Sequence, residues 1–173
     1  MLPSSSSSPR GGPHVHLHLL SASLYQLYEE LEDFRQRCGF PLATYSLKTV
    51  RPKKAKQTLQ TLLEDPLAFK RRALQRLFQT YPQRHFVLVG DTGEKDPQVY
   101  ASMAQEYPEQ VLAIYLRSVG RGAATNSVDV SYRVKQIMSS YGISSDKWKV
   151  FEDPSELETI DLPQLLLLKE QER

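Results

Sequence analysis

Cysteine is almost absent from this sequence, since Cys38 is the only one among 173 residues. A single thiol excludes an internal disulfide and any zinc site built from several cysteines, and it fits a reducing compartment. No run of about 18 apolar residues exists, so the sequence predicts no membrane-spanning helix. The first thirteen residues contain no apolar stretch of signal-peptide length. We therefore expect a soluble, cytoplasmic protein that can bind peripherally at membranes, with Cys38 packed at a helix end.

An excess of charge of one sign is also absent. There are 22 Lys and Arg residues against 20 Asp and Glu residues, which leaves a net charge of +2. Locally, however, nine basic residues lie between Lys48 and Arg76, against the two acids Glu64 and Asp65. This patch could bind an anionic phospholipid surface, contact nucleic-acid phosphates or form a solvated linker and helix face. The lysines at 53–56 have no aromatic residues between them for base stacking, so we do not expect a nucleic-acid partner.

Three segments follow from composition. Residues 1–13 are mainly Ser, Pro and Gly and predict a disordered lead-in, because they cannot bury enough apolar surface to offset the entropy of ordering. Residues 14–119 predict an α/β core. Residues 120–173 predict a C-terminal extension with a helix, a strand and an acidic tail helix.

Strand patterns alternate with helix patterns through the core and into the extension. Ser23 with Gln26 matches a capping box that would open the first helix, which Gly39 would end. Asp96 followed by Pro97 predicts an N-cap and first residue for a later helix. This alternation predicts an α/β fold with a mostly parallel, Rossmann-like sheet flanked by helices. The predicted strands are residues 15–20, 40–48, 85–90, 111–116 and 148–152, and the predicted helices are residues 23–38, 69–80, 96–107 and 130–141, with a tail helix from Asp153.

Polar residues follow several of these strands directly. Ser21-Ala22-Ser23 follows the first, residues 90–96 (GDTGEKD) follow the third, and Arg117-Ser118 follows the fourth. Ligands of such sheets bind at the carboxyl ends of the strands, so we expect these residues at one edge, with Lys70 from a helix start beside them.

The chemistry of this set suits a phosphate group bound with magnesium. Asp91 and Asp96 offer the oxygen ligands that Mg²⁺ takes, while Ser hydroxyls and the Lys70 ammonium suit phosphoryl oxygens. The alternatives are structural: Asp96 as an N-cap, Ser21 and Ser23 as caps, and Lys70 as a solvated charge. His14, His16 and His18 share one strand face and could ligate zinc, but no fourth ligand is nearby, and polar alternation at a strand end is simpler.

The order of these motifs resembles the haloacid dehalogenase superfamily of phosphohydrolases. Ser21 matches its second motif, Lys70 its third, and the Gly90-Asp91 to Asp96 loop its fourth. Three longer stretches are similar to the actin-patch type of phosphatidate phosphatase catalytic domain: LLSASLYQLYEELEDF, KRRALQRLFQTYPQRHFVLVGDTGEKDPQVY and EYPEQVLAIYLRSV. The resemblance covers roughly residues 15–119.

The resemblance implies a Mg²⁺-dependent enzyme that removes phosphate from phosphatidate, leaving diacylglycerol, through an aspartyl-phosphate intermediate. It implies that Ser21 hydrogen-bonds the transferring phosphoryl group, with Ala22 and Ser23 beside it. Lys70 would offset the developing charge. Asp91 would hold Mg²⁺, and Asp96 would be a second ligand or would orient Lys70.

The family nucleophile and general acid are missing from this sequence. Both belong to a D-x-D-x-T motif on the first strand of the fold, and no D-x-D occurs here. The strand that carries it lies centrally, between the strands at residues 15–20 and 85–90, so we expect a sheet incomplete at this N-terminal central strand and a chain inactive as written. A truncated gene model, splice product or fragment explains this best. The alternative is a remnant that binds anionic lipid or phosphate without chemistry.

Overall fold

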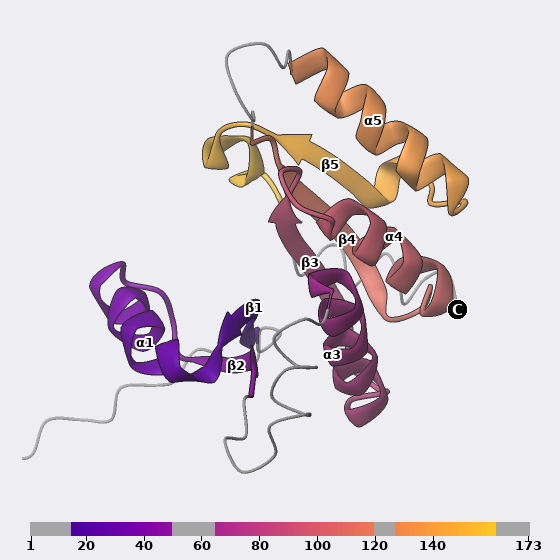
Figure 1. The fold of residues 1–173 in the computed structure, drawn as a ribbon. Coiled ribbons are helices and arrows are strands. Elements are labelled where there is room, and N and C mark those ends of the chain that lie inside the picture. Colours follow the sequence, from indigo (N-terminus) through magenta and orange to yellow (C-terminus); the bar gives the residue numbers. More distant parts are fainter. Residues whose placement is uncertain (1–14, 50–64, 120–126, 162–173) are drawn as a thin grey trace, which may run out of the picture.

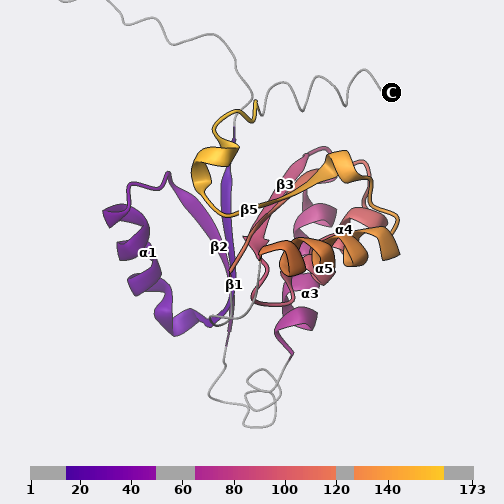
Figure 2. The ribbon, with the colours of Figure 1, turned by 90° about the horizontal axis from the view of Figure 1, so that it is seen from above.

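The computed structural model describes residues 15–49, 65–119 and 127–161. Within these ranges five strands form two parallel sheets, one of two strands and one of three (Figure 1). Seen from above, α1 lies on one side of the strands and α3, α4 and α5 lie on the other (Figure 2). The predicted class, a mixed α/β protein with parallel strands flanked by helices, is confirmed.

The first sheet pairs β1 (Leu17–Leu24) with β2 (Ala43–Lys48), and the crossover carries η1 (Tyr25–Leu27) and α1 (Tyr28–Arg37). The prediction that a helix opens at Ser23 was wrong, because Ser23 belongs to β1. Leu24 still pairs with Lys48 across a bulge, and this pairing keeps the segment extended. No side chain caps η1 or α1, so the expected capping box is not formed.

The end of α1 follows the sequence more closely. Gly39 has φ +71°, a left-handed conformation that glycine adopts at little cost, and it ends the helix as expected. Cys38 precedes it and is exposed, so the expectation of a packed thiol was wrong.

A partly buried ion pair within α1 is linked to β2. The guanidinium of Arg35 donates to both carboxylate oxygens of Glu32 at 2.8 and 2.6 Å, and to the carbonyl of Phe40 at 2.6 Å. The hydroxyl of Tyr45 donates to the same carboxylate at 2.8 Å. Glu32 therefore connects the helix, the turn and the second strand.

The second sheet has the order β3 (Phe86–Asp91), β4 (Val111–Arg117) and β5 (Trp148–Phe151). Three helices accompany it: α3 (Pro66–Thr80), α4 (Asp96–Glu106) and α5 (Ser127–Ser140). These six elements lie within a few residues of their predicted positions. In the register, Val89 pairs with Tyr115 and Asp91 with Arg117, so the last residues of β3 and β4 lie at the same edge.

The core lies between this sheet and its helices. Its fully buried members come from α3, α4, β4 and α5, and include Phe78, Met103, Ile114, Leu116 and Met138. Phe78 stacks on Phe86 with ring centroids 4.3 Å apart, which fixes α3 against the start of β3. Apolar burial of this kind stabilises a fold by roughly 25 cal/mol per Å², and here it positions the helix that carries Lys70.

Where the tail helix was predicted to open at Asp153, the described residues contain only a short 3₁₀ turn, η3 (Pro154–Leu157), and they are not helical from 158 to 161. Another 3₁₀ turn, η2 (Ser145–Lys147), precedes β5. Asp153 and Glu156 form a capping box at the start of η3. Residues 162–173, the lead-in at 1–13, His14 and residues 120–126 lie outside the described residues, and so do the predictions made for them.

The two sheets share no ladder between the described strands. β1 pairs only with β2 in the described ranges, and β3 pairs there only with β4. The sequence predicted a sheet incomplete at a strand between these two, and the described strands form two sheets with no ladder between β1 and β3. α3 packs against both β1 and α4 and so links the two parts. No helix in the described ranges is long and apolar enough to span a membrane.

Candidate functional site

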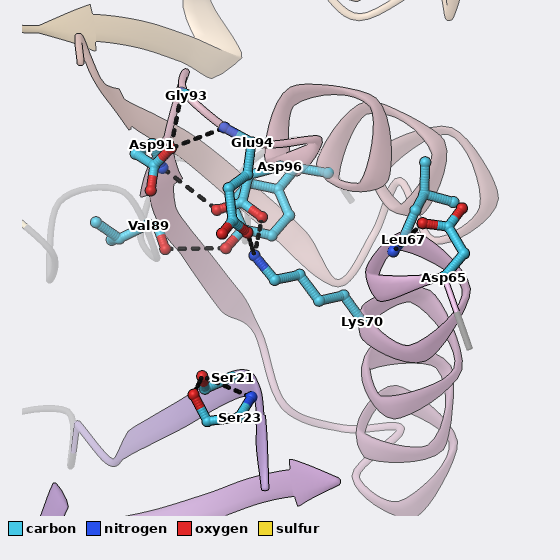
Figure 3. A network of polar contacts seen from close by, with 11 residues as sticks. Ser21, Ser23, Asp65, Leu67, Lys70, Val89, Asp91, Gly93, Glu94 and Asp96 are labelled. Atoms are coloured by element: carbon cyan, nitrogen blue, oxygen red, sulfur yellow. Dashed lines mark hydrogen bonds and ion pairs between the residues drawn. The ribbon is translucent and has the colours of Figure 1, made fainter. Parts of the chain in front are cut away.

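The turn after β3 is organised by the side chain of Asp91. Its Oδ1 accepts hydrogen bonds from the backbone N–H groups of Gly93 at 2.7 Å and Glu94 at 3.1 Å (Figure 3). Within the described part of the chain, Oδ2 of Asp91 accepts no hydrogen bond. One carboxylate oxygen thus holds the loop, and the other remains available for a ligand.

Lys70 reaches this loop from α3. Asp65 caps the helix by accepting from the N–H of Leu67 at 3.2 Å, and Pro66 follows at the first helical position. This start places Lys70 early in the helix, as the sequence predicted. Its Nζ lies 2.5 Å from Oδ1 of Asp96 and 2.8 Å from Oε2 of Glu94.

Asp96 connects the helix, the strand and the loop. While Oδ1 binds Lys70, Oδ2 accepts from the backbone N–H of Asp91 at 3.3 Å. The prediction of Asp96 as an N-cap was wrong: Lys95 has that position, and Asp96 is the first residue of α4. Its carboxylate, only 6% exposed, orients the lysine instead of capping the helix.

The charges of this cluster stabilise one another. Burial by itself lowers the pKa of Lys70, but hydrogen bonds to the carboxylates of Asp96 and Glu94 outweigh it, so the pKa is raised. Lys70 is therefore an ammonium at neutral pH. The cluster of Lys70, Asp91, Glu94 and Asp96 carries one positive and three negative formal charges, which favours a cation or a metal-bound anion over a free anion.

Two residues that the sequence analysis did not assign also shape the loop. Tyr100, on α4, donates from its hydroxyl to the carbonyl of Val89 at 2.9 Å. Burial raises the pKa of Tyr100, and the nearby charges of Asp96 and Asp91 raise it further. Gly90 lies close to both Asp96 and Tyr100. A Cβ at position 90 would be 2.6 Å from Asp96 Oδ2 and 2.8 Å from the Tyr100 ring. The tyrosine follows Asp96 by one helical turn, and that spacing is the signal that could have identified it.

Ser21, Ala22 and Ser23 lie apart from this cluster. They belong to β1, in the other sheet, and all three are partly buried. The Ser21 hydroxyl donates to Ser23 Oγ at 2.9 Å and accepts from the Ser23 N–H at 3.2 Å (Figure 3). Among the described residues neither serine forms a hydrogen bond with Lys70 or the loop. Thus the structure brings together Lys70, Asp91 and Asp96 but places the predicted serine site separately.

The other candidate groups have structural partners. His16 and His18 lie within 2.9 Å of the Thr44 hydroxyl, and His18 Nε2 also lies 2.9 Å from Ser46 Oγ. In the described ranges no group of three or more His, Cys, Asp or Glu side chains is placed to hold a metal ion. His14, the third member of the histidine set, lies outside the described residues.

The basic patch is only partly a free surface. Lys48 is 5% exposed, and its Nζ lies 5.7 Å from the ring centroid of Phe69. Arg71 donates to Glu106 at 2.9 Å, and Lys70 belongs to the loop cluster. Arg51, Lys53, Lys54 and Lys56 lie outside the described residues.

Comparison with known proteins identifies relatives of this chain. The model of the family described as phosphatidate phosphatase APP1, catalytic domain, matches residues 6–118. The chain is 33% identical over 103 residues to an uncharacterized protein of Schizosaccharomyces pombe, a match that covers 60% of this chain and 16% of the relative. It is 35% identical over 57 residues to phosphatidate phosphatase APP1 of Saccharomyces cerevisiae, covering 33% of this chain and 10% of the relative. The chain thus matches only a small part of either relative's length. No solved structure matches.

Proposed function

The chain belongs to the family of phosphatidate phosphatase catalytic domains, and on that premise we propose that it binds the phosphate group of phosphatidate, together with Mg²⁺, at the end of β3. One observation carries the proposal: α3 and β3 bring the Lys70 ammonium and the Asp91 carboxylate to one loop, with Asp96 between them. An ammonium suits phosphate oxygens, and a carboxylate suits Mg²⁺.

The donor set fits magnesium with Asp91 as its protein ligand. Mg²⁺ is commonly held by one or two carboxylates, several waters and the substrate phosphate. Asp91 has one oxygen not hydrogen-bonded to described residues, whereas both oxygens of Asp96 already accept hydrogen bonds. We therefore assign Asp91 as the ligand and Asp96 as the group that orients Lys70. Bound there, Mg²⁺ would neutralise charge on the phosphate oxygens.

We further propose that the fold is of the haloacid dehalogenase type. In that arrangement a strand carrying D-x-D-x-T would lie between β1 and β3, which share no ladder within the described ranges. Ser21, near the end of β1, would then reach the phosphoryl group from the far side of that strand. The serine and lysine sites would thus form one pocket only when the additional strand is present.

Hydrolysis by this route needs an aspartate that the sequence does not supply. The nucleophile would form an aspartyl-phosphate that water then cleaves, yet none of the eight aspartates belongs to a D-x-D motif. We propose that the 173 residues bind phosphate and Mg²⁺, and that turnover requires the D-x-D-x-T strand. The missing motif also favours the second candidate, a remnant that binds anionic lipid without chemistry.

Vesicle binding separates the two candidates. We would measure cosedimentation of the chain with phosphatidylcholine vesicles containing phosphatidate, with Mg²⁺ or with a chelator, and assay released phosphate in the same samples. The variant is Asp91→Asn. Its matched control is Asp129→Asn, the same change at an exposed aspartate in the first turn of α5.

The phosphatase-site proposal expects Mg²⁺-dependent binding without phosphate release. Asp91→Asn should raise the Mg²⁺ concentration required by at least about tenfold, since loss of even an outer-shell partner costs 10–100-fold in metal affinity. The control should bind like the wild type. Vesicle binding that is independent of Mg²⁺, unchanged in Asp91→Asn and weakened by added salt would instead support the lipid-binding remnant. Phosphate release would contradict the requirement for a D-x-D-x-T strand.

A further inference from the structure

The two partners of the Lys70 ammonium have different surroundings. The Asp96 side chain is 6% exposed and makes the shorter contact, at 2.5 Å. The Glu94 side chain is 56% exposed, and its contact is 2.8 Å (Figure 3). A buried carboxylate is costly to separate from its cation, whereas an ion pair open to water contributes little to stability. Asp96 is thus a fixed partner, while Glu94 can be exchanged.

Glu94 can release the lysine without refolding the loop. Its backbone N–H donates to Asp91 Oδ1 at 3.1 Å, so its main chain is anchored independently of its side chain. Rotation of the exposed side chain is enough to free one donor of Lys70, and such rotations take picoseconds to nanoseconds. Because Asp96 keeps its hydrogen bond, the ammonium would stay in place while that donor becomes available.

The charge balance indicates what would replace Glu94. With Asp91, Glu94 and Asp96 around one lysine, an approaching anion meets net negative charge. An anion that takes over the position of the Glu94 carboxylate accepts the same hydrogen bond from Nζ. Its binding also moves the negative charge of the Glu94 carboxylate away from Lys70. A phosphate group beside Mg²⁺ suits such an exchange, because its oxygens are strong acceptors for an ammonium.

We infer that Glu94 is an exchangeable partner of Lys70: it holds the ammonium in the ligand-free protein and is displaced when a phosphate group binds. The inference rests on the proposed function, since it takes the Lys70 loop as the phosphate site. It makes Glu94 a positioning residue that opposes ligand binding. Its removal should therefore tighten binding and, in a form of the enzyme that turns over, lower KM with little change in kcat.

The test measures binding of inorganic phosphate in the presence of Mg²⁺ by ³¹P NMR titration, which reaches millimolar affinities. The variants are Glu94→Gln, Lys70→Met and the double variant, and Glu30→Gln on α1 is a control with the same change in net charge. We expect Glu94→Gln to bind phosphate about threefold to tenfold more tightly, the range expected for removing one exposed ion pair and one nearby like charge. The control should leave the affinity unchanged.

The double variant shows whether Glu94 acts through Lys70. If it does, the gain in affinity from Glu94→Gln should be much smaller when residue 70 is methionine, because only the like-charge repulsion is then removed, and the coupling should be visible in the double-mutant cycle. An equal gain in both backgrounds would overturn the inference, because it would mean general repulsion. An unchanged affinity in Glu94→Gln, with Lys70→Met weakened, would overturn the inference and leave the proposed function intact.

Failure of the proposed function has a different signature. Full phosphate binding by Lys70→Met, or no binding by the wild type at tens of millimolar phosphate, would overturn the phosphate site itself. Parallel titrations with phosphatidate vesicles separate the two sources of the group. If Glu94→Gln binds both probes more tightly, the phosphate group is sufficient. If it binds only the vesicles more tightly, the lipid headgroup is required. Urea unfolding of each variant shows whether its fold is retained.

Discussion

The α-carbon of Gly90 lies directly against the carboxylate of Asp96, so that a Cβ at position 90 would be 2.6 Å from Oδ2. Within the described ranges only Gly39 and Gly142 have positive φ angles. The requirement for glycine at position 90 is therefore one of space, not of backbone conformation. The strand end and the carboxylate that orients Lys70 fit together only without a side chain.

Replacement of this glycine should disturb the site and the fold together. We expect Gly90→Ala to destabilise the protein by about 1–3 kcal/mol, the usual cost of forcing an extra methyl group into a packed region. Because the clash is with Asp96, phosphate affinity should fall as well. Urea unfolding and phosphate titration measure the two effects. Val89→Ala, at a neighbouring side chain that is 59% exposed, is the control, and equal stability losses in both variants would refute the clash.

Tyr100 should support the same strand end through its hydroxyl. Tyr100→Phe removes the 2.9 Å hydrogen bond to the Val89 carbonyl but keeps the ring against Gly90. We expect a loss of about 1 kcal/mol, the typical net contribution of one hydrogen bond. Tyr132→Phe is the matched control, because Tyr132 is 63% exposed and should change stability by less than about 0.5 kcal/mol. Identical unfolding curves for the two variants would rule out a role for the Tyr100 hydroxyl.

Glu32 should make part of the stability depend on pH in the acid range. Hydrogen bonds from Arg35, Gln36 and Tyr45 lower the pKa of Glu32 from 4.5 to about 2. A carboxyl group whose pKa is lower in the folded state stabilises the protein above its unfolded pKa, and this contribution is lost as the pH falls through the folded value. The free energy of unfolding should therefore decline as the pH falls from about 4.5 to about 2.

The variant Glu32→Gln isolates this contribution. It should be less stable than the wild type at neutral pH, and its unfolding free energy should change less between pH 4.5 and pH 2. Glu29→Gln, an exposed glutamate on the same helix, is the control and should keep the wild-type profile. Urea unfolding at several pH values provides the measurement. A Glu32→Gln profile parallel to that of the wild type would contradict the assignment.

The sequence predicted the part of the candidate site that lies at the end of β3. Asp91 is the last residue of β3, at the end of a strand that the sequence predicts, and the helix start at Asp65 and Pro66 places Lys70 early in α3. The contact between Lys70 and Glu94 joins residues 24 positions apart, and no local pattern indicates it. The close approach of Gly90 to Tyr100 was equally hidden, because it depends on how α4 packs against β3.

The fold was predictable where nearby residues determine the secondary structure. It was not predictable where pairing with a distant strand determines it. Helix α3 has strong apolar periodicity and a clear cap, and it was expected almost as it is found. Ser23 has the side chain of a helix cap, but β1 stays extended through Leu24, which pairs with Lys48 of another strand. Such pairing energy comes from outside the segment, so the residues around Ser23 could not reveal it.

The division of the described strands into two sheets has a consequence for handling the protein. One five-stranded sheet would have two edge strands, but sheets of two and three strands have four, namely β1, β2, β3 and β5. Each edge presents backbone N–H and C=O groups that can pair with another molecule. Concentrated samples of the isolated chain should therefore associate through their strand edges. A peptide strand that fits between β1 and β3 should act as a solubilising agent as well as a structural complement.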